Sequence, residues 1–325
     1  MRILLNGAVA RRGAEALRRR FGEAVELDEI GEAEEAEAVA AKFARAEVVI
    51  SMSYDGGFPP APRLKLLQLP ISGLDTVDLA AVPAGASVCN VYEHEIGIAE
   101  YVFAGMLAWT VDLTGRDARF RTGDWGDSPR FGAPPRGELA GRTVGLLGYG
   151  NIGQAVARRA LAFGMTVKAV TRNPRPLEPE PAFLGPYEAL DDVLSGADFL
   201  VVCCPLTEAT RGLVGEAELM ALPDGAVLIN VARGAIVDED ALYRALQEGR
   251  LGGAVLDTWY QYAEPAHPDL RPSRHPFHEL DNVLMTPHLS GWTEGQQRRR
   301  WARMLDNIAA QMAGQALENV VRPAA

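Results

Sequence analysis

Three apolar segments of the chain each end in a residue that could do acid–base or anion chemistry. Arg233 follows the letters LINVA and precedes Gly234, so its guanidinium could hold a carboxylate through two parallel hydrogen bonds, or pair with a neighbouring loop. Asp257 ends the letters GGAVLD, where a carboxylate is poorly solvated unless a ligand or a nearby donor bonds to it. His288 follows Pro287 in VLMTPHLSGWT and could carry a proton near neutral pH. Together they indicate a site that could bind a carboxylate and transfer a proton.

A fourth segment, TVGLLGYGNIGQAVARRALAFG (143–164), carries the spacing GxGxxG at Gly148, Gly150 and Gly153. An apolar strand runs into these glycines and an amphipathic helix follows them. This context suits a turn that lets a pyrophosphate approach bare backbone at the positive end of a helix. The segment therefore predicts dinucleotide binding rather than an ordinary tight turn.

The end of the following strand bears on which dinucleotide is bound. An acidic residue there would accept the ribose hydroxyls and repel a 2′-phosphate, but this chain has Thr171 followed by Arg172. Arg172 and Arg175 offer positive charge and bidentate geometry to a phosphate. We therefore expect NADP(H) to be preferred, with NAD(H) possible if these arginines only face solvent.

Short apolar stretches alternate with helical patterns along the chain, which is typical of parallel sheets covered by helices on both faces. In the first part, strands are expected over 3–5, 48–52, 64–69 and 87–91, with helices over 13–21 and 34–45. After the glycine strand, further strands are expected over 166–171, 199–203, 226–231, 253–257 and 283–285. The pattern predicts an α/β fold with two doubly wound parallel-sheet domains.

Two longer helical patterns connect these parts. One keeps apolar helical spacing from residue 96 to about 120, and another runs beyond residue 293 and is expected to return to the first domain. Residues 122–141 are rich in Gly and Pro and are expected to form an extended linker. The expected domains are residues 1–113 with 290–325, and residues 114–289.

Composition narrows the class of protein. The 325 residues are 48% hydrophobic, which supplies a core for two domains. The net charge of −11 argues against nucleic acid as a partner. The cysteines, of which Cys203 and Cys204 are adjacent in FLVVCCP, are expected to be reduced core residues, and no metal site is predicted. The longest apolar runs fall short of the roughly 20 residues of a membrane span, so we expect no membrane partner and a cytoplasmic location.

The chain resembles the D-isomer-specific 2-hydroxyacid dehydrogenases over nearly its whole length. The similar blocks are GRTVGLLGYGNIGQAVARRALAFGM, VVCCPLTEATRGLVGEAELMALPDGAVLINVARGAIVDEDALYRAL, GGAVLDTW and MTPHLSG. The resemblance implies a Rossmann NAD(P)-binding domain, a discontinuous flavodoxin-like substrate domain and a homodimer. It also implies that Arg233 holds and polarises a small 2-keto acid, that His288 donates a proton to the carbonyl oxygen, and that Asp257 binds the nicotinamide carboxamide.

From these arguments follow two sets of expected contacts. The cofactor would meet Gly148, Gly150, Asn151, Ile152, Gly153, Thr171, Arg172, Arg175, Cys204, Pro205, Thr207, Val231, Ala232, Arg233, Asp257, His288, Ser290 and Gly291. The substrate would meet Tyr54, Ser72, Gly73, His94, Arg233, His288 and Trp292, where the segment ISGLD matches a loop that takes the carboxylate on backbone amides in the family. For Tyr54, His94 and Trp292, packing between domains is an equally good reading.

One departure from the family pattern concerns the glutamate that normally bonds to the catalytic histidine. Five residues after Asp257 stands Tyr262, whereas Glu264 lies two residues later, before Pro265. Gln261 is a third candidate, because formate dehydrogenases use a glutamine beside their histidine. We expect Glu264 to serve as a catalytic residue, while the other two alignments stay open.

Substrate identity is less determined. Glyoxylate or hydroxypyruvate is the default expectation. A formate or phosphite dehydrogenase, and a nucleotide-dependent sensor or corepressor-like binding protein, remain alternatives. An assay panel with both cofactors separates them.

Overall fold

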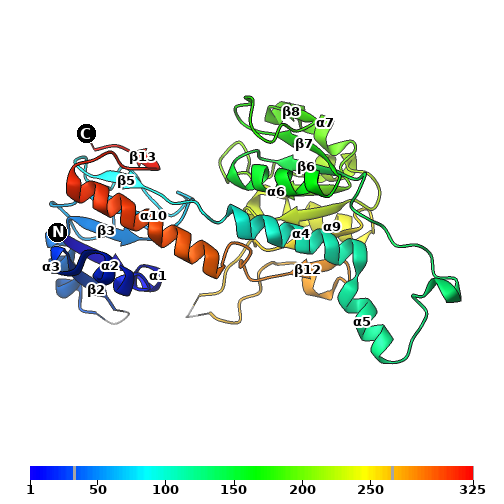
Figure 1. Cartoon of the computed structure of the whole chain (residues 1–325), viewed down its shortest axis with the longest axis horizontal. Helices are drawn as coiled ribbons and strands as arrows, with labels where there is room; N and C mark the ends of the chain where they lie inside the picture. Colours follow the sequence, from blue (N-terminus) through cyan, green and yellow to red (C-terminus); the bar gives the residue numbers. More distant parts are fainter. Residues whose placement is uncertain (32–33, 265–266, 325) are drawn as a thin grey trace. The chain divides into compact units, whose positions relative to one another are not determined.

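The computed structural model describes residues 1–31, 34–264 and 267–324 and divides into two compact units (Figure 1). The first domain comprises Met1–Glu93 and Glu294–Ala325, and the second comprises His94–Thr293. The boundary expected after residue 113 therefore lies at residue 93. The reason is that helix α4 (Glu95–Val111) packs through Val102, Phe103 and Met106 into the core of the second domain.

Among the described residues, the first domain contains a six-stranded sheet of order β13-β5-β4-β3-β1-β2. Its parallel strands are β1 (Arg2–Asn6), β2 (Glu26–Ile30), β3 (Val48–Ser51), β4 (Leu66–Gln68) and β5 (Ser87–Cys89). The parallel order 2-1-3-4-5 is flavodoxin-like, as the resemblance implies. Strand β13 (Val320–Arg322) adds an antiparallel edge.

Helices cover both faces of this sheet. They are α1 (Ala8–Arg11), α2 (Ala14–Phe21), α3 (Ala36–Arg45) and α10 (Glu294–Ala313). Because side chains alternate along a strand, Ile3 and Leu5 pack with Leu17 of α2 and Ile308 of α10, whereas Leu4 packs with Phe43 of α3. Strand β2 was not expected, since its sequence ELDEI is mostly acidic and half-buried at the sheet edge.

The described part of the second domain contains a seven-stranded parallel sheet of order β12-β11-β10-β9-β6-β7-β8. Its strands are β6 (Thr143–Leu147), β7 (Thr166–Val170), β8 (Phe183–Gly185), β9 (Phe199–Val202), β10 (Val227–Asn230), β11 (Gly253–Leu256) and β12 (Val283–Met285). Read from β6, this is the Rossmann order, and it reverses between β6 and β9. Ligands of such sheets bind outside the carboxyl ends of the strands at that reversal.

Two hydrophobic cores sandwich the second sheet. Helices α4 and α6 (Asn151–Ala162) lie side by side on one face (Figure 1). Helices α7 (Leu190–Leu194), α8 (Glu216–Ala221) and α9 (Glu239–Gln247) cover the other face. The sheet is buried on both faces, which explains why its strands read as nearly continuous apolar runs.

The prediction of a single helix over residues 96–120 is wrong. Helix α4 ends at Val111, Asp112 takes a left-handed conformation with φ 48°, and α5 (Leu113–Arg121) starts anew. Arg119 of α5 pairs with Asp112 at 2.9 Å, which stabilises the break.

Among the described residues no single helix is long and apolar enough to cross a membrane. Within the described ranges, only α4 and α5 together pass by length and composition, as a pair bent by 47°.

Candidate active site

The glycine turn of the second domain is closed on its inner side and open on its outer side. A Cβ atom on Gly148, whose φ is 113°, would lie 2.7 Å from the amide nitrogen of Cys204 at the end of β9. A Cβ on Gly153 would lie 2.3 Å from the carbonyl oxygen of Gly148. A Cβ on Gly150, in contrast, would meet no atom within 4 Å. The turn thus offers bare backbone to a ligand.

This open side lies at the amino terminus of the 12-residue helix α6, whose first two residues are Asn151 and Ile152. Unpaired amide groups and the helix dipole favour an anion there. The residues present therefore fit the pyrophosphate of a dinucleotide. Gly148, Gly150, Asn151, Ile152 and Gly153, the five predicted cofactor contacts in this turn, thus lie where a pyrophosphate could bind.

The adjacent cysteines support this turn from inside. The thiol of Cys203 donates a hydrogen bond to the carbonyl oxygen of Gly148 at 3.1 Å. Burial raises the pKa of the Cys203 thiol, and burial likewise raises the pKa of Cys204 to about 12. Thiols held in this way are not nucleophiles at neutral pH, in agreement with their reading as core residues.

The expected ribose end of the site lies where β7 ends. Thr171 is half-buried, and its amide donates to the carbonyl oxygen of Gly185 at 2.9 Å. Arg172 and Arg175 are exposed, and among the described residues neither forms an ion pair with a carboxylate. Both guanidinium groups are therefore available to an anion.

The loop after β9 is held by hydrogen bonds of the Thr210 hydroxyl. Thr210 donates to the carbonyl oxygen of Pro205 at 2.7 Å and accepts the amide hydrogen of Thr207 at 2.8 Å. Pro205 and Thr207 are exposed, while Cys204 is buried. Of the three expected cofactor contacts in this loop, Pro205 and Thr207 have exposed surface and Cys204 does not.

Arg233, Asp257 and His288 follow three neighbouring strands. Strand β10 pairs with β11, and β11 pairs with β12, all in parallel. The carboxyl ends of these strands therefore meet at one edge of the sheet, where sequence reasoning placed the chemistry. This is the grouping on which the site depends.

The backbone around Arg233 is fixed by the preceding strand. The side chain of Asn230 accepts the amide hydrogen of Ala232 and donates to the carbonyl oxygen of Arg233, both at 3.0 Å. The Arg233 Nη1 donates to the carbonyl oxygen of Ala232 at 2.8 Å. Val231 and Ala232 are buried, whereas the Arg233 side chain is half-exposed. Two hydrogen bonds of the Asn230 side chain thus hold the backbone that carries the guanidinium.

Asp257 is bonded to the segment that carries His288. Its side chain is fully buried, and its carboxylate accepts three hydrogen bonds from the segment that carries His288. The donors are the Thr286 hydroxyl at 2.6 Å, the Leu289 amide at 2.8 Å and the Ser290 amide at 2.9 Å. The nearby donors that its burial demands come from the histidine loop, and the expected contact with the nicotinamide carboxamide stays a prediction.

Ser290 and Gly291, which are predicted cofactor contacts, follow His288 in the same loop. Ser290 is 4% exposed and its amide hydrogen is used by Asp257. A Cβ on Gly291 would lie 3.4 Å from the Cβ of His94 and 3.5 Å from Ile98. Gly291 therefore packs against the start of α4, whereas Ser290 is buried and bonded to Asp257.

His288 itself is exposed and has a left-handed backbone with φ 55°. Its amide donates to the carbonyl oxygen of Thr286 at 3.0 Å, which turns the chain around Pro287. The ring of Tyr262 lies beside the imidazole, with centroids 5.6 Å apart and planes inclined by 47°. The Tyr262 hydroxyl accepts the amide hydrogen of Trp259 at 3.2 Å.

The structure does not bring Glu264 to His288. Glu264 is exposed, its carbonyl oxygen accepts the amide hydrogen of His267 at 2.8 Å, and within the described ranges no hydrogen bond or ion pair joins its carboxylate to the imidazole. Pro265, the other half of the expected Glu-Pro pair, lies outside the described residues. Gln261 is exposed, and its amide donates to Pro272. Of the three candidates, Tyr262 is the one whose ring contacts the histidine.

Among the expected substrate contacts of the first domain, Tyr54 is a core residue. It is 3% exposed, and its ring stacks on Phe58 with centroids 5.1 Å apart and planes inclined by 12°. Burial raises the pKa of its hydroxyl. Ser72 and Gly73 are half-exposed in the loop that follows β4, where the carbonyl oxygen of Ser72 accepts a hydrogen bond from Asn90 at 2.8 Å.

The remaining substrate candidates belong to the second domain. His94 is 9% exposed at the first residue of that domain, just before α4. Trp292 is 48% exposed, and its amide donates to the carbonyl oxygen of Leu289 at 2.8 Å. Trp292 therefore offers surface to a substrate, whereas His94 is enclosed.

Sequence reasoning missed residues that hold the histidine loop. The Tyr101 hydroxyl of α4 is 2.6 Å from the Thr286 hydroxyl, and the Trp259 indole donates to the Thr286 carbonyl oxygen at 2.8 Å. The only signal in the sequence is that Thr286 stands two residues before His288. Tyr101 carries no such signal, because it lies 185 residues from Thr286.

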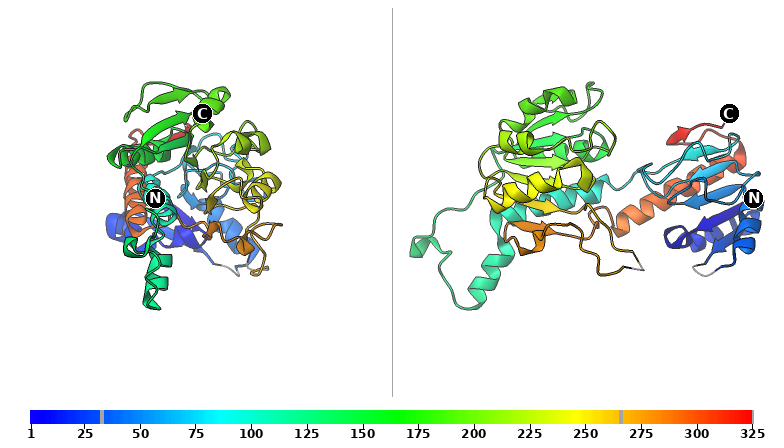
Figure 2. Two further views of the ribbon diagram at one scale, coloured as in Figure 1. Left: turned by 90° about the vertical axis from the view of Figure 1, so that its right-hand side faces the viewer. Right: turned by 180° about the vertical axis from the view of Figure 1, so that it is seen from behind.

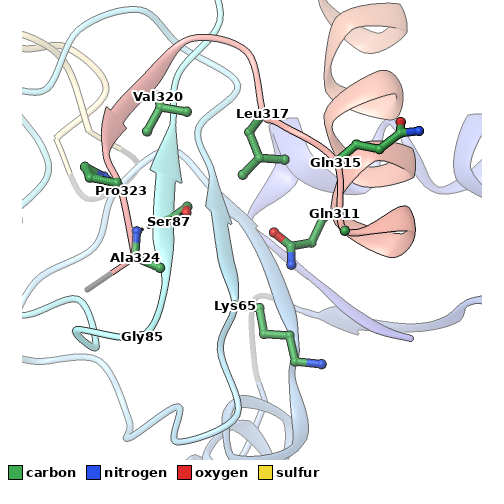
Figure 3. A pocket seen from close by; sticks show the side chains of 10 residues that line it. Lys65, Gly85, Ser87, Gln311, Gln315, Leu317, Val320, Pro323 and Ala324 are labelled. Atoms are coloured by element: carbon green, nitrogen blue, oxygen red, sulfur yellow. Dashed lines mark hydrogen bonds between the residues drawn. The ribbon is translucent and has the colours of Figure 1, made fainter.

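A hollow of about 390 Å³ lies elsewhere, on the first domain (Figure 3). It is lined by Lys65 and Ser87 at the amino ends of β4 and β5, and by Gln311, Gln315 and Leu317 near the end of α10. None of the expected substrate contacts lines it. Within the described residues, no group of three or more His, Cys, Asp or Glu side chains could hold a metal ion.

Comparison with known proteins identifies the family. Residues 103–290 match the model of the D-isomer specific 2-hydroxyacid dehydrogenase, NAD binding domain. The chain belongs to this family. It is therefore an oxidoreductase with a nicotinamide dinucleotide cofactor, and its family members act on small keto or hydroxy acids.

Several members of the family are similar over most of the chain. A glyoxylate reductase of Aeropyrum pernix is 35% identical over 267 residues, which cover 80% of this chain and 77% of that protein. A hydroxypyruvate reductase of Thermotoga maritima is 34% identical over 247 residues, covering 75% and 76%. A D-3-phosphoglycerate dehydrogenase of Methanocaldococcus jannaschii is 33% identical over 309 residues, but the chain spans only 56% of its length.

A solved structure of a 2-hydroxyacid dehydrogenase from Ketogulonicigenium vulgare Y25 has a TM-score of 0.83 with 29% identity, covering 100% of this chain and 99% of that one. The dehydrogenase described here thus shares the family's fold over its whole length.

Proposed function

We propose that this dehydrogenase reduces a small 2-keto acid, such as glyoxylate or hydroxypyruvate, to the D-2-hydroxy acid, with NADPH as the preferred hydride donor. The observation that carries the proposal is the grouping of Arg233, Asp257 and His288 at the ends of three neighbouring strands. The relatives named glyoxylate reductase and hydroxypyruvate reductase support the choice of substrate.

The proposed reaction assigns one task to each exposed group of the site. A reduced nicotinamide, when bound, would supply the hydride that the carbonyl carbon receives. Arg233 holds the substrate carboxylate through two hydrogen bonds and polarises the carbonyl. The imidazolium of His288 gives its proton to the carbonyl oxygen, so that the hydroxyl forms as the C–H bond forms. Asp257 keeps the histidine loop in place, and its contact with the nicotinamide carboxamide is part of the proposal.

The preference for NADPH rests on the end of β7. Thr171 stands where a carboxylate would repel the 2′-phosphate. Arg172 and Arg175 are exposed, and no carboxylate of the described part of the chain pairs with them. Replacing both arginines by glutamine should raise the KM for NADPH by about tenfold or more and leave the KM for NADH nearly unchanged. Arg244→Gln, on α9, removes one arginine charge elsewhere in the domain and should change neither KM. A wild-type kcat/KM that favours NADH would refute the preference.

The partner of His288 stays a proposal. A carboxylate beside the imidazolium would raise its pKa and extend reduction to higher pH. Glu264→Gln should therefore move the falling limb of the kcat/KM profile to lower pH if the loop carries Glu264 to His288 when ligands bind. An unmoved profile, with a shift in Tyr262→Phe instead, would assign that position to Tyr262, as its contact in the structure favours.

A homodimer is proposed as well. Helix α5 and the segment that follows it stand away from the rest of the second domain (Figures 1 and 2) and expose Phe120, Trp125 and Phe131 at 54%, 53% and 69%. Exposed rings in this number suit a surface that a second copy covers.

The cysteines are free thiols, which fits the reducing cytoplasm as the compartment.

A panel of 2-keto acids assayed with NADPH and with NADH tests the reaction. We expect His288→Gln to lower kcat by about 10²–10⁴-fold, because it removes the proton donor. His278→Gln, which replaces an exposed histidine of the same domain, is the matched control and should leave kcat unchanged. Tight cofactor binding without turnover would instead indicate a nucleotide-dependent binding protein. Reduction of NAD(P)⁺ by formate or phosphite would indicate a formate or phosphite dehydrogenase.

A further inference from the structure

We infer that Tyr101 and Thr286 are positioning residues, which act through Asp257 to hold His288 in its left-handed backbone conformation. The inference rests on the proposed role of His288 as proton donor. Neither residue carries a role from the family resemblance.

The hydrogen bonds form a directed chain. The Thr286 hydroxyl donates to Asp257 Oδ1 at 2.6 Å, and a hydroxyl has only one hydrogen to donate. The Tyr101 hydroxyl, 2.6 Å from the Thr286 oxygen, must therefore be the donor in that pair. Burial raises the pKa of the Tyr101 hydroxyl, which keeps it protonated and able to donate. Tyr101 thus fixes the orientation of the Thr286 hydroxyl toward the carboxylate.

Asp257 connects this chain to the backbone on the other side of His288. Its two oxygens accept the amide hydrogens of Leu289 and Ser290, the two residues that follow the histidine. The carboxylate therefore bonds to the segment two residues before His288 and again one and two residues after it. A φ of 55° is sparsely populated for a residue with a side chain and persists only where its surroundings over-determine it. The chain of bonds provides that constraint.

Tyr101 is itself held rigidly. It lies on α4, whose Val102 and Met106 are fully buried in the same core as Val255 of β11. The adjoining strand β12 leads directly into Thr286. A helix packed on the sheet thus reaches across to the loop that carries the imidazole, and the Trp259 indole bond to the Thr286 carbonyl oxygen adds a second support.

The test compares variants that remove one hydroxyl each. Thr286→Val keeps the shape of the side chain and should lower kcat about tenfold or more, with KM within about twofold, because the carboxylate clamp on Arg233 is untouched. Tyr101→Phe should lower kcat about three- to tenfold. Thr286→Ser restores the hydroxyl and should return kcat to within about threefold of wild type. Thr110→Val, which removes a hydroxyl from α4 outside the chain of bonds, should change nothing.

A second measurement needs no cofactor. Hydrogen exchange of the Leu289 and Ser290 amides should become about tenfold faster in Thr286→Val and in Tyr101→Phe, while exchange in the strands of the sheet stays as in wild type. If Thr286→Val and Tyr101→Phe keep wild-type kcat and exchange while His288→Gln is inactive, the inference is overturned and the proposed function stands. A failure of Thr286→Ser to rescue would also overturn it. If His288→Gln remains active, the proposed function itself fails.

Discussion

The glycine turn allows a sharp separation of folding from cofactor binding. Gly150 and Gly153 are three residues apart in one motif, yet a methyl group added to each meets opposite surroundings. On Gly150 it would meet nothing within 4 Å, whereas on Gly153 it would lie 2.3 Å from the Gly148 carbonyl oxygen. We predict that Gly150→Ala folds normally and binds the dinucleotide poorly, and that Gly153→Ala is destabilised even without cofactor.

The magnitude for Gly150→Ala follows from its backbone. With φ −83° and ψ −157° it adopts a conformation open to alanine. Losing glycine at a helix N-cap costs roughly 0.5 kcal/mol, and the stiffer unfolded chain offsets this by about 0.4–1 kcal/mol. The Tm should therefore stay within about 2 °C of wild type. The methyl group keeps the pyrophosphate from the backbone, and one lost charge-assisted hydrogen bond of about 1.5–3 kcal/mol weakens the Kd roughly 10- to 150-fold.

Gly153→Ala has the opposite balance. Its new methyl group presses on a backbone oxygen that cannot rotate away, and overpacking of this kind costs roughly 1–3 kcal/mol. Alanine returns up to about 1 kcal/mol as the better helix former. A net loss of about 1–2 kcal/mol in a domain of this size lowers the Tm by about 2–8 °C.

Thermal unfolding of the cofactor-free variants and fluorescence titration with NADPH measure the two effects. The reasoning predicts a crossed result, with the loss of affinity in Gly150→Ala and the loss of Tm in Gly153→Ala. Gly123→Ala, in the segment after α5, is unsuitable as a control because its φ is 84°, so Gly56→Ala, with open space around it in the first domain, serves instead. Equal Tm losses in Gly150→Ala and Gly153→Ala, or an unchanged Kd in Gly150→Ala, would refute it.

Three further predictions follow from other parts of the chain. Because burial raises the pKa of Cys89 and of Cys204 to about 12, about one such thiol in ten thousand is ionised at pH 8, and a thiol reagent should label neither until the protein is denatured; rapid labelling of the native protein would contradict this. His275 and then Arg274 lower the pKa of Asp240, so its stabilising effect is present above the ordinary aspartate pKa of 3.8 and is lost as pH falls through the lowered value. Asp240→Asn should therefore have a lower Tm than wild type at pH 7, and the difference should close below about pH 3.8, whereas a difference that persists at pH 2.5 would point to another cause. Trp125→Ser should shift light-scattering mass toward that of a monomer, and an unchanged dimer would exclude this arm from the interface.

The parts of the fold that the sequence predicted well are those with continuous local patterns. Buried parallel strands read as apolar runs, and nearly all were located within one or two residues. Strand β2 was missed because its edge position leaves ELDEI half-exposed, and the long helix was not expected to break because its apolar spacing continues past Asp112. Neither the edge position nor the left-handed turn is written in local periodicity.

The sequence by itself determined the family, the glycine turn and the strand ends that carry Arg233, Asp257 and His288, because each depends on neighbouring letters of the chain. Only the tertiary structure shows which segments surround these residues. Asp257 bonds to the histidine loop, the ring of Tyr262 rather than the carboxylate of Glu264 lies beside His288, and Tyr101 supports the loop from 185 residues away. The physical reason is that a buried hydrogen bond is set by which segments packing brings together, and packing joins residues that are remote in sequence.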